Sequence, residues 1–148
     1  MAGSIGGGWL PAKFLKLGWS LNAARKSAML LCAVVVVPVM AAGSAGHLWW
    51  AVALVGLATA AHQGWSANLY TIVSDTFPKH VVGSVIGFGG FGGAVGGMLI
   101  ATFTGWLLQV TGSYVPVFVI AGSAYLVALI VIQLLVPKLE PATIEKKA

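Results

Sequence analysis

Four long apolar runs constrain the fold of this chain more than any other feature of its sequence. They cover residues 27–43, 48–73, 82–108 and 114–136, and they contain no Asp, Glu, Lys or Arg. About 20 apolar residues are enough for a helix to cross the hydrocarbon core of a bilayer. Because unpaired backbone groups are costly in lipid, each run is expected to be helical. The sequence therefore predicts an all-α integral membrane protein that crosses the bilayer four times.

The composition agrees with a membrane protein. Of the 148 residues, 59% are hydrophobic and only 7% are charged, whereas soluble domains carry roughly 25% charged residues. The net charge of +5 does not indicate nucleic-acid binding, because the eight basic residues lie in the gaps between apolar runs. With one cysteine, Cys32, no internal disulfide can form, and no metal site or cofactor is expected. No nucleophile–base pair is visible, so an enzyme is not expected.

The third run is crowded with glycine. Small-xxx-small spacings overlap in it, at Gly83/Gly87, Gly89/Gly93, Gly92/Gly96 and Gly93/Gly97. Small residues let membrane helices approach closely. On a helical wheel these glycines form two flat faces, so we expect this helix to lie between neighbours that the rest of the chain supplies. The alternative is a single helix–dimer contact.

The basic residues predict the orientation. They are Lys13, Lys16, Arg25 and Lys26 before the first run, Lys79 between the second and third, and Lys138, Lys146 and Lys147 after the fourth. With four crossings all eight fall on one side, which the positive-inside rule makes cytoplasmic. The C-terminus is then cytoplasmic as well. Asp75 lies at the same end, where solvation or a contact with Lys79 is expected.

A polar stretch, residues 62–71, interrupts the second run. On a helical wheel five polar side chains in or next to this stretch fall within about 100° of arc. They are His62, Ser66, Thr59, Tyr70 and Gln63. Polar groups at membrane depth are rare and mark ligand or ion pathways by default. The donors and acceptors here, together with the indole of Trp65, suit a hydroxylated ligand.

The alternative for each polar residue is a bond between helices. For Gln63, Ser66 and Tyr70 we favour a ligand-facing role. His62 either faces ligand or bonds a neighbouring carbonyl. Asn68, on a different face, either binds ligand or pins the adjacent helix. The structural role is favoured for the remaining hydroxyls, which are those of Thr59, Thr71 and Ser74.

Several motifs, taken in order, resemble the major facilitator superfamily. They read GSIGGGWL (3–10), GWS (18–20) with ARK (24–26), HQGWSANL (62–69) and SDxFPK (74–79), followed by the glycine-rich run. Within that superfamily the chain is similar to the anion:cation symporter branch, in particular to bacterial hexuronate (glucuronate/galacturonate) transporters. The superfamily's loop motif normally carries an acidic residue after its glycine, and none stands between Gly8 and Lys13.

The resemblance implies part of the C-terminal six-helix half of a twelve-helix carrier. Residues 1–12 would be the end of helix 8, the four runs would be helices 9 to 12, and residues 137–148 a cytoplasmic tail. The residues that it places at the central site are Gln63, Trp65, Ser66, Asn68 and Tyr70 on helix 10, and Gly89 and Gly90 on helix 11. Proton-coupling groups are implied mainly in the absent first half.

The function implied is the C-terminal segment of a proton-coupled hexuronate symporter of the bacterial inner (plasma) membrane, which works by alternating access. Its partners would be a sugar-acid anion, a proton, the lipid bilayer and a missing N-terminal half, and no nucleic acid. We expect that the chain is a fragment of a larger protein, that its start site is called too late, or that its gene is split or decayed. We also expect it to be inactive alone. The alternatives are a small dimeric four-helix transporter and a membrane accessory or structural subunit. For Arg25 and Lys26 two roles are open. They either hold helix ends or bind anionic lipid, or they only orient the chain by their charge.

Overall fold

The computed structural model describes residues 2–139, and every regular element in that range is a helix. The elements are α1 (Ala2–Lys16), α2 (Leu21–Val36), the 3₁₀ helix η1 (Val37–Ser44), α3 (Leu48–Thr76), α4 (Lys79–Thr111) and α5 (Val115–Leu135). The all-helical membrane fold expected from the sequence is confirmed. Most of the predicted tail, from residue 140 to 148, lies outside the described residues.

Three helical stretches are long and apolar enough to cross a membrane. They are Leu21–Ser44, Lys79–Thr111 and Val115–Leu135. The 29 residues of α3 are long enough, but polar side chains such as His62 and Gln63 lower its mean hydropathy. Length and composition thus support three of the four predicted crossings, and the crossing by α3 stays a prediction.

Local sequence signals set the ends of the helices. The Ser20 hydroxyl accepts a hydrogen bond from the Ala23 amide at 3.2 Å and so caps the start of α2. Pro38 cannot donate a backbone hydrogen bond. The α-helix accordingly ends at Val36 and continues as the 3₁₀ helix η1. Pro38 therefore marks a change in helix type within this segment. At the end of α4, Gly112 adopts a φ of +64° as the C-cap.

Several helices extend beyond the apolar runs at their basic ends. α1 continues to Lys16 instead of residue 12, α2 begins at Leu21 instead of residue 27, and α4 begins at Lys79 instead of residue 82. An apolar run indicates which residues suit lipid, whereas caps, glycine and proline end the helix. Lys and Arg are good helix formers, so the helices continue through them.

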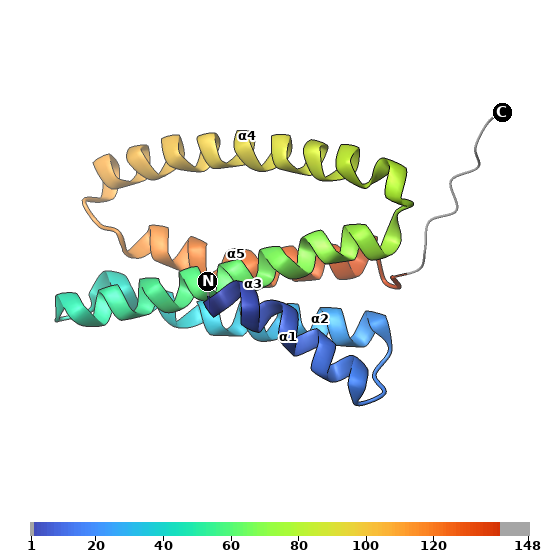
Figure 1. The fold of residues 1–148 in the computed structure, drawn as a ribbon. Helices are drawn as coiled ribbons and strands as arrows, with labels where there is room; N and C mark the ends of the chain where they lie inside the picture. Colours follow the sequence, from blue (N-terminus) through green and yellow to red (C-terminus); the bar gives the residue numbers. More distant parts are fainter. Residues whose placement is uncertain (1, 140–148) are drawn as a thin grey trace.

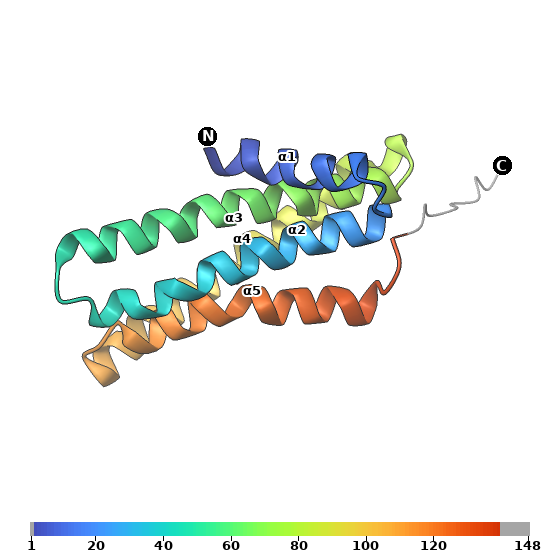
Figure 2. The same cartoon turned by 90° about the horizontal axis from the view of Figure 1, so that it is seen from below.

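Helices α1, α2, α3 and α5 lie side by side (Figure 2). Their core contains two clusters of buried residues: Met29, Cys32, Ala33 and Trp65 in one, and Val36, Val39, Ala42 and Ala61 in the other. The closest approach joins α1 to α3, where a Cβ added at Gly7 would collide with the Gly64 backbone. Such backbone contact needs small residues on both helices.

Helix α4 lies apart from the other helices along most of its length (Figure 1). It has no buried residue. A Cβ added at any glycine from Gly83 to Gly97 would meet nothing within 4 Å. The expectation that the chain supplies neighbours for both glycine faces is therefore wrong for residues 2–139. The connections on either side of α4 are short, so its ends are held against α3 and α5 while its middle packs on neither.

The helices alternate in direction and gather the basic residues at one end. The α1–α2 turn, the α3–α4 turn and the end of α5 lie together (Figure 1). They bring six basic residues to this basic end: Lys13, Lys16, Arg25, Lys26, Lys79 and Lys138. The turns at residues 45–47 and 112–114, at the opposite end, contain no Lys or Arg. This is the arrangement that the charge pattern predicts; which side of the membrane it faces stays a prediction.

Candidate substrate-facing surface on α3

The polar stretch of α3 divides into an exposed stripe and a packed face. His62, Gln63 and Tyr70 are exposed and Ser66 is half-buried. These four residues form what we call the polar stripe. Trp65 is buried, with 6% of its surface exposed. The predicted site residues of α3 therefore do not share a single surface.

Within residues 2–139, no hydrogen bond joins the side chains of Gln63, Ser66 or Tyr70 to the protein. Tyr70 is 51% exposed. An amide, a hydroxyl and a phenol thus remain able to donate and accept hydrogen bonds. Since polar groups in a membrane helix face the bundle interior or a water-filled cavity, the stripe is expected to meet a polar partner.

His62 is bonded across the helix interface. Its Nδ1 lies 2.6 Å from the Tyr125 hydroxyl of α5, so the partner is a phenol and not the backbone carbonyl that we considered. The Tyr125 ring also stands edge-on to the Trp65 ring, with centroids 5.4 Å apart. His62, Thr59 and Tyr125 contribute to the lining of a cavity of about 320 Å³, whose other walls are apolar.

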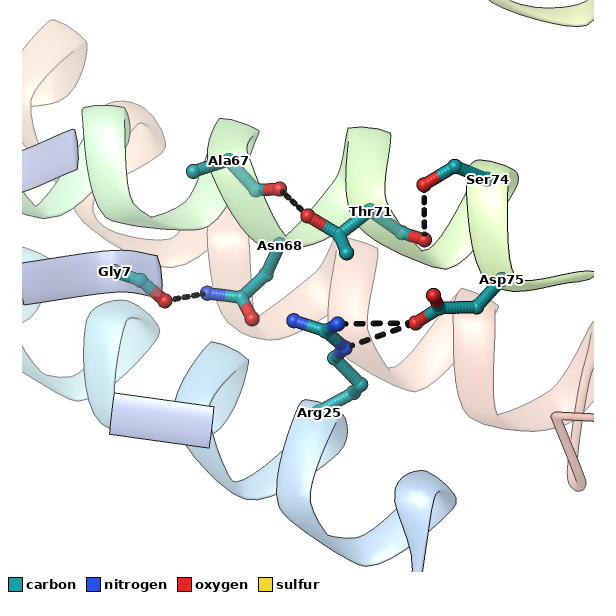
Figure 3. A network of polar contacts seen from close by, with 7 residues as sticks. All are labelled: Gly7, Arg25, Ala67, Asn68, Thr71, Ser74 and Asp75. Carbon is teal, nitrogen blue, oxygen red and sulfur yellow. Dashed lines mark hydrogen bonds and ion pairs between the residues drawn. The ribbon is translucent and has the colours of Figure 1, made fainter. Parts of the chain in front are cut away.

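Asn68 pins α1 to α3. Its Nδ2 donates to the Gly7 carbonyl of α1 at 2.8 Å (Figure 3). It also donates to the Gly64 carbonyl of its own helix at 2.9 Å. The side chain is 1% exposed. Of the two roles left open for Asn68, the structure shows the helix contact. Its Oδ1 is buried and has no partner among the described residues.

The remaining hydroxyls of α3 bond their own helix, which agrees with the structural role favoured for them. Thr59 donates to the Val55 carbonyl at 2.8 Å, and Thr71 to the Ala67 carbonyl at 2.6 Å. Ser74 bonds the Thr71 carbonyl at 2.9 Å (Figure 3). These groups are therefore not available to a ligand in the way that the polar stripe is.

Gly89 and Gly90 lie on α4, the helix that stands apart. Both are exposed, and no atom lies within 4 Å of a Cβ placed at either. The structure does not bring these two glycines together with the polar stripe. Their role at a substrate site stays a prediction.

The basic end is held by two cationic side chains of α2. Arg25 bonds the Asp75 carboxylate of α3 through Nη2 at 3.0 Å and Nε at 3.2 Å (Figure 3). Asp75 is exposed, as expected, but the cation that it contacts is Arg25 and not Lys79. These two groups are 50 residues apart, so only the packing of α2 on α3 brings them together.

Lys26 faces α5 instead. Its Nζ donates to the carbonyls of Val136 and Pro137 at 2.6 and 2.8 Å and to Gln133 Oε1 at 2.8 Å. Consecutive helical residues point about 100° apart, so Arg25 and Lys26 reach different neighbours. Both therefore clamp helix ends, which was one of the roles left open for them.

Tyr125 is the residue of this surface that sequence reasoning missed. It lies inside the apolar run of α5, where a phenol needs a polar partner. That isolated hydroxyl was the available signal. The sequence could not show that its partner is His62, 63 residues away.

Comparison with known proteins identifies the class of this membrane protein. The family model described as Major Facilitator Superfamily matches residues 4–148. The chain therefore belongs to the Major Facilitator Superfamily, and is a multi-pass membrane protein of a transporter family, not an enzyme.

The chain is also similar to a named transporter of this superfamily. The chain is 26% identical over 146 residues, which is 99% of its own length and 32% of the relative's, to the "Probable galactarate/D-glucarate transporter GudP" of Bacillus subtilis (strain 168). The chain thus spans about a third of the length of this relative. The resemblance to a sugar-acid branch of the superfamily is confirmed at this level.

Proposed function

We propose that this chain supplies membrane helices to a proton-coupled symporter of sugar acids, which works by alternating access. The observation that carries the proposal is the polar stripe, a line of exposed and half-buried hydrogen-bonding side chains on α3. Leaving such groups without partners in lipid is costly, so they are expected to line the substrate path. The similarity to a sugar-acid transporter supports the choice of substrate class.

The chemistry of the stripe fits a hydroxylated anion. Gln63 can donate and accept, and the Ser66 and Tyr70 hydroxyls can do the same. In this proposal Trp65 has a structural role beside the polar stripe, because its buried ring packs edge-on against the Tyr125 ring. Gly89 and Gly90 would let α4 approach the ligand closely.

Proton coupling in this proposal uses carboxylates outside these helices. The sequence contains only three acidic residues, Asp75, Glu140 and Glu145, and none lies in an apolar run. Asp75 is also paired with Arg25. An intramembrane carboxylate is the usual proton carrier, and the sites that carry the proton would lie in a part of the carrier that this chain does not contain.

The proposed location is the bacterial inner (plasma) membrane, with the basic end in the cytoplasm. The C-terminus would then be cytoplasmic as well, because α5 ends at the basic end (Figure 1).

A chimera tests the substrate class. This chain would replace the matched segment of the Bacillus subtilis relative, and uptake of labelled galactarate and glucuronate would be measured in cells that lack other sugar-acid carriers. We expect uptake that a protonophore abolishes. Gln63→Leu with Ser66→Ala should weaken the apparent affinity while the amount in the membrane is unchanged. Uptake that does not respond to these substitutions would contradict a ligand role for the stripe.

This chain alone is not expected to transport. Helix α4 has no buried residue and the polar stripe is open, so residues 2–139 do not enclose a substrate site. Proteoliposomes that contain only this chain should show no more glucuronate uptake than protein-free liposomes under an inward proton gradient. Concentrative uptake by the chain alone would refute this expectation.

A further inference from the structure

Tyr125 connects α5 to the polar stripe through contacts with two residues of α3. Its hydroxyl lies 2.6 Å from His62 Nδ1. Its ring is edge-on to Trp65 at 5.4 Å and to His62 at 6.0 Å between centroids. The half-buried ring also packs against both core clusters. The phenol is thus held in place by packing and not only by its hydrogen bond.

The direction of the Tyr125–His62 hydrogen bond follows from acid–base chemistry. A neutral imidazole nitrogen is a far better acceptor than a phenol oxygen, and a phenol is a good donor. The Tyr125 O–H therefore donates, and Nδ1 of His62 accepts. The bond made by one ring nitrogen decides which tautomer the imidazole adopts. With Nδ1 as acceptor, the proton of neutral His62 lies on Nε2.

We propose that Tyr125 is a positioning residue that holds His62 in the Nε2–H tautomer and so presents an N–H donor at the polar stripe. The ligand that this donor would meet is an oxygen of an anionic, hydroxylated molecule. That part rests on the proposed function, whereas the tautomer does not.

Among the described residues, no charged side chain near His62 competes with Tyr125 for control of its tautomer. The runs of α2, η1, α3 and α5 that pack around it, residues 27–73 and 115–135, contain no Asp, Glu, Lys or Arg. Arg25 and Lys26, at the start of α2, are engaged with Asp75 and the end of α5. Within residues 2–139 the Tyr125 bond is the only side-chain hydrogen bond of His62, and the imidazole is exposed.

The tautomer can be measured directly on the ligand-free chain. The full chain, labelled with ¹⁵N-histidine and held in lipid nanodiscs, would be studied by long-range ¹H–¹⁵N correlation at a pH where His62 is neutral. His62→Gln identifies the His62 signals among those of three histidines. We expect the Nε2–H pattern, with Nδ1 shifted as for a hydrogen-bond acceptor. Tyr125→Phe, which keeps the ring, should remove that shift.

Tyr114→Phe is the matched control, because Tyr114 is exposed and lies at the far end of α5. It should leave the His62 signals unchanged. An Nδ1–H pattern in the unmodified chain, or identical Nδ1 signals with and without the Tyr125 hydroxyl, would overturn the inference. An Nδ1–H pattern would be seen in the unmodified chain alone. The inference can therefore still be overturned if the Tyr125→Phe variant folds poorly.

A second measurement addresses the ligand and uses the chimera with the Bacillus subtilis relative, because residues 2–139 alone do not enclose a substrate site. Galactarate should shift the Nε2–H signal of His62, whereas the uncharged polyol galactitol should not. Tyr125→Phe should weaken galactarate binding about two- to tenfold, the usual effect of one hydrogen bond. Equal affinity with and without the Tyr125 hydroxyl would overturn the positioning role. A chimera that binds no sugar acid would contradict the proposed ligand, while the tautomer result on the chain alone would still decide what Tyr125 does to His62.

Discussion

At the scale of single residues, the most consequential side chain is a buried amide that joins two helices. Asn68 spans the contact between α1 and α3 and satisfies the Gly7 carbonyl. Pro11 follows four residues later on the same helix. A proline has no N–H, so the Gly7 carbonyl lacks its usual backbone donor in the helix. The amide of Asn68 supplies the missing donor.

We therefore expect Asn68→Ala to lower the free energy of unfolding by about 1–2 kcal/mol. The change removes a bond between helices and leaves the Gly7 carbonyl buried without a donor. Unfolding in mixed detergent micelles, followed by circular dichroism, measures the loss.

Thr71→Ala is the control for Asn68→Ala, because the Thr71 hydroxyl bonds only its own helix. Its effect should stay below about 0.5 kcal/mol. Equal losses in the two variants would show that Asn68 does not hold α1 in place.

The polar stripe could be predicted from the sequence, but its partner could not. A helical wheel groups His62, Gln63, Ser66 and Tyr70 because the period of an α-helix is fixed. Tyr125 belongs to another helix, and its contact with His62 depends on the rotation and separation of α3 and α5. Those are set by packing, which a single helical pattern does not contain.

At the scale of helices, glycine has two different consequences in this chain. In α1 and α3 it permits backbone contact, between Gly7 and Gly64. In α4 the glycines contact nothing among the described residues. The same small-residue spacing therefore indicates that a helix can pack closely, but not which partner it packs against.

Gly7→Ala should separate α1 from α3 and cost about 1–3 kcal/mol, as overpacking does. The measurement is the same detergent unfolding. Gly8→Ala is matched to it, because Gly8 is exposed and a Cβ there meets nothing within 4 Å. That variant should be neutral or stabilising by up to about 1 kcal/mol. Similar destabilisation by both substitutions would contradict the close α1–α3 contact.

Lys26 is expected to stabilise the end of α5. Lys26→Met keeps the length of the side chain but leaves three oxygen acceptors without their ammonium donor. A loss of about 1.4 kcal/mol would raise the local opening equilibrium about tenfold. Hydrogen exchange at the Val136 amide reports it. Lys79→Met, on exposed α4, should leave that exchange unchanged; an unchanged rate in Lys26→Met would contradict the clamp.

At the scale of the whole molecule, the alternation of charged and uncharged turns predicts the sidedness. Charged residues are excluded from lipid, so the turns that carry them are expected on the same side of the membrane. The individual pairs at the basic end could not be predicted. Arg25 and Asp75 lie 50 residues apart, whereas Lys79 is only four residues from Asp75 in the sequence and is not its partner.

Cysteine labelling tests the orientation. Ser44→Cys and Ser113→Cys should react with a membrane-impermeant maleimide from outside intact cells. Lys16→Cys and Lys138→Cys should react only after permeabilisation. The native Cys32 is buried, so Cys32→Ala is needed only if the unmodified chain reacts. The opposite pattern of labelling would reverse the proposed topology.

The side-chain bonds between helices are unevenly distributed along the bundle. Arg25 and Lys26 tie α2 to α3 and α5 at the basic end, whereas the contact near Gly43 at the opposite end is with Val115 and Phe118, which are apolar. We therefore expect the four packed helices to splay from the uncharged end and pivot about the charged one. Amide exchange should accordingly be faster at residues 45–50 than at residues 21–26, and the reverse order would exclude such a pivot.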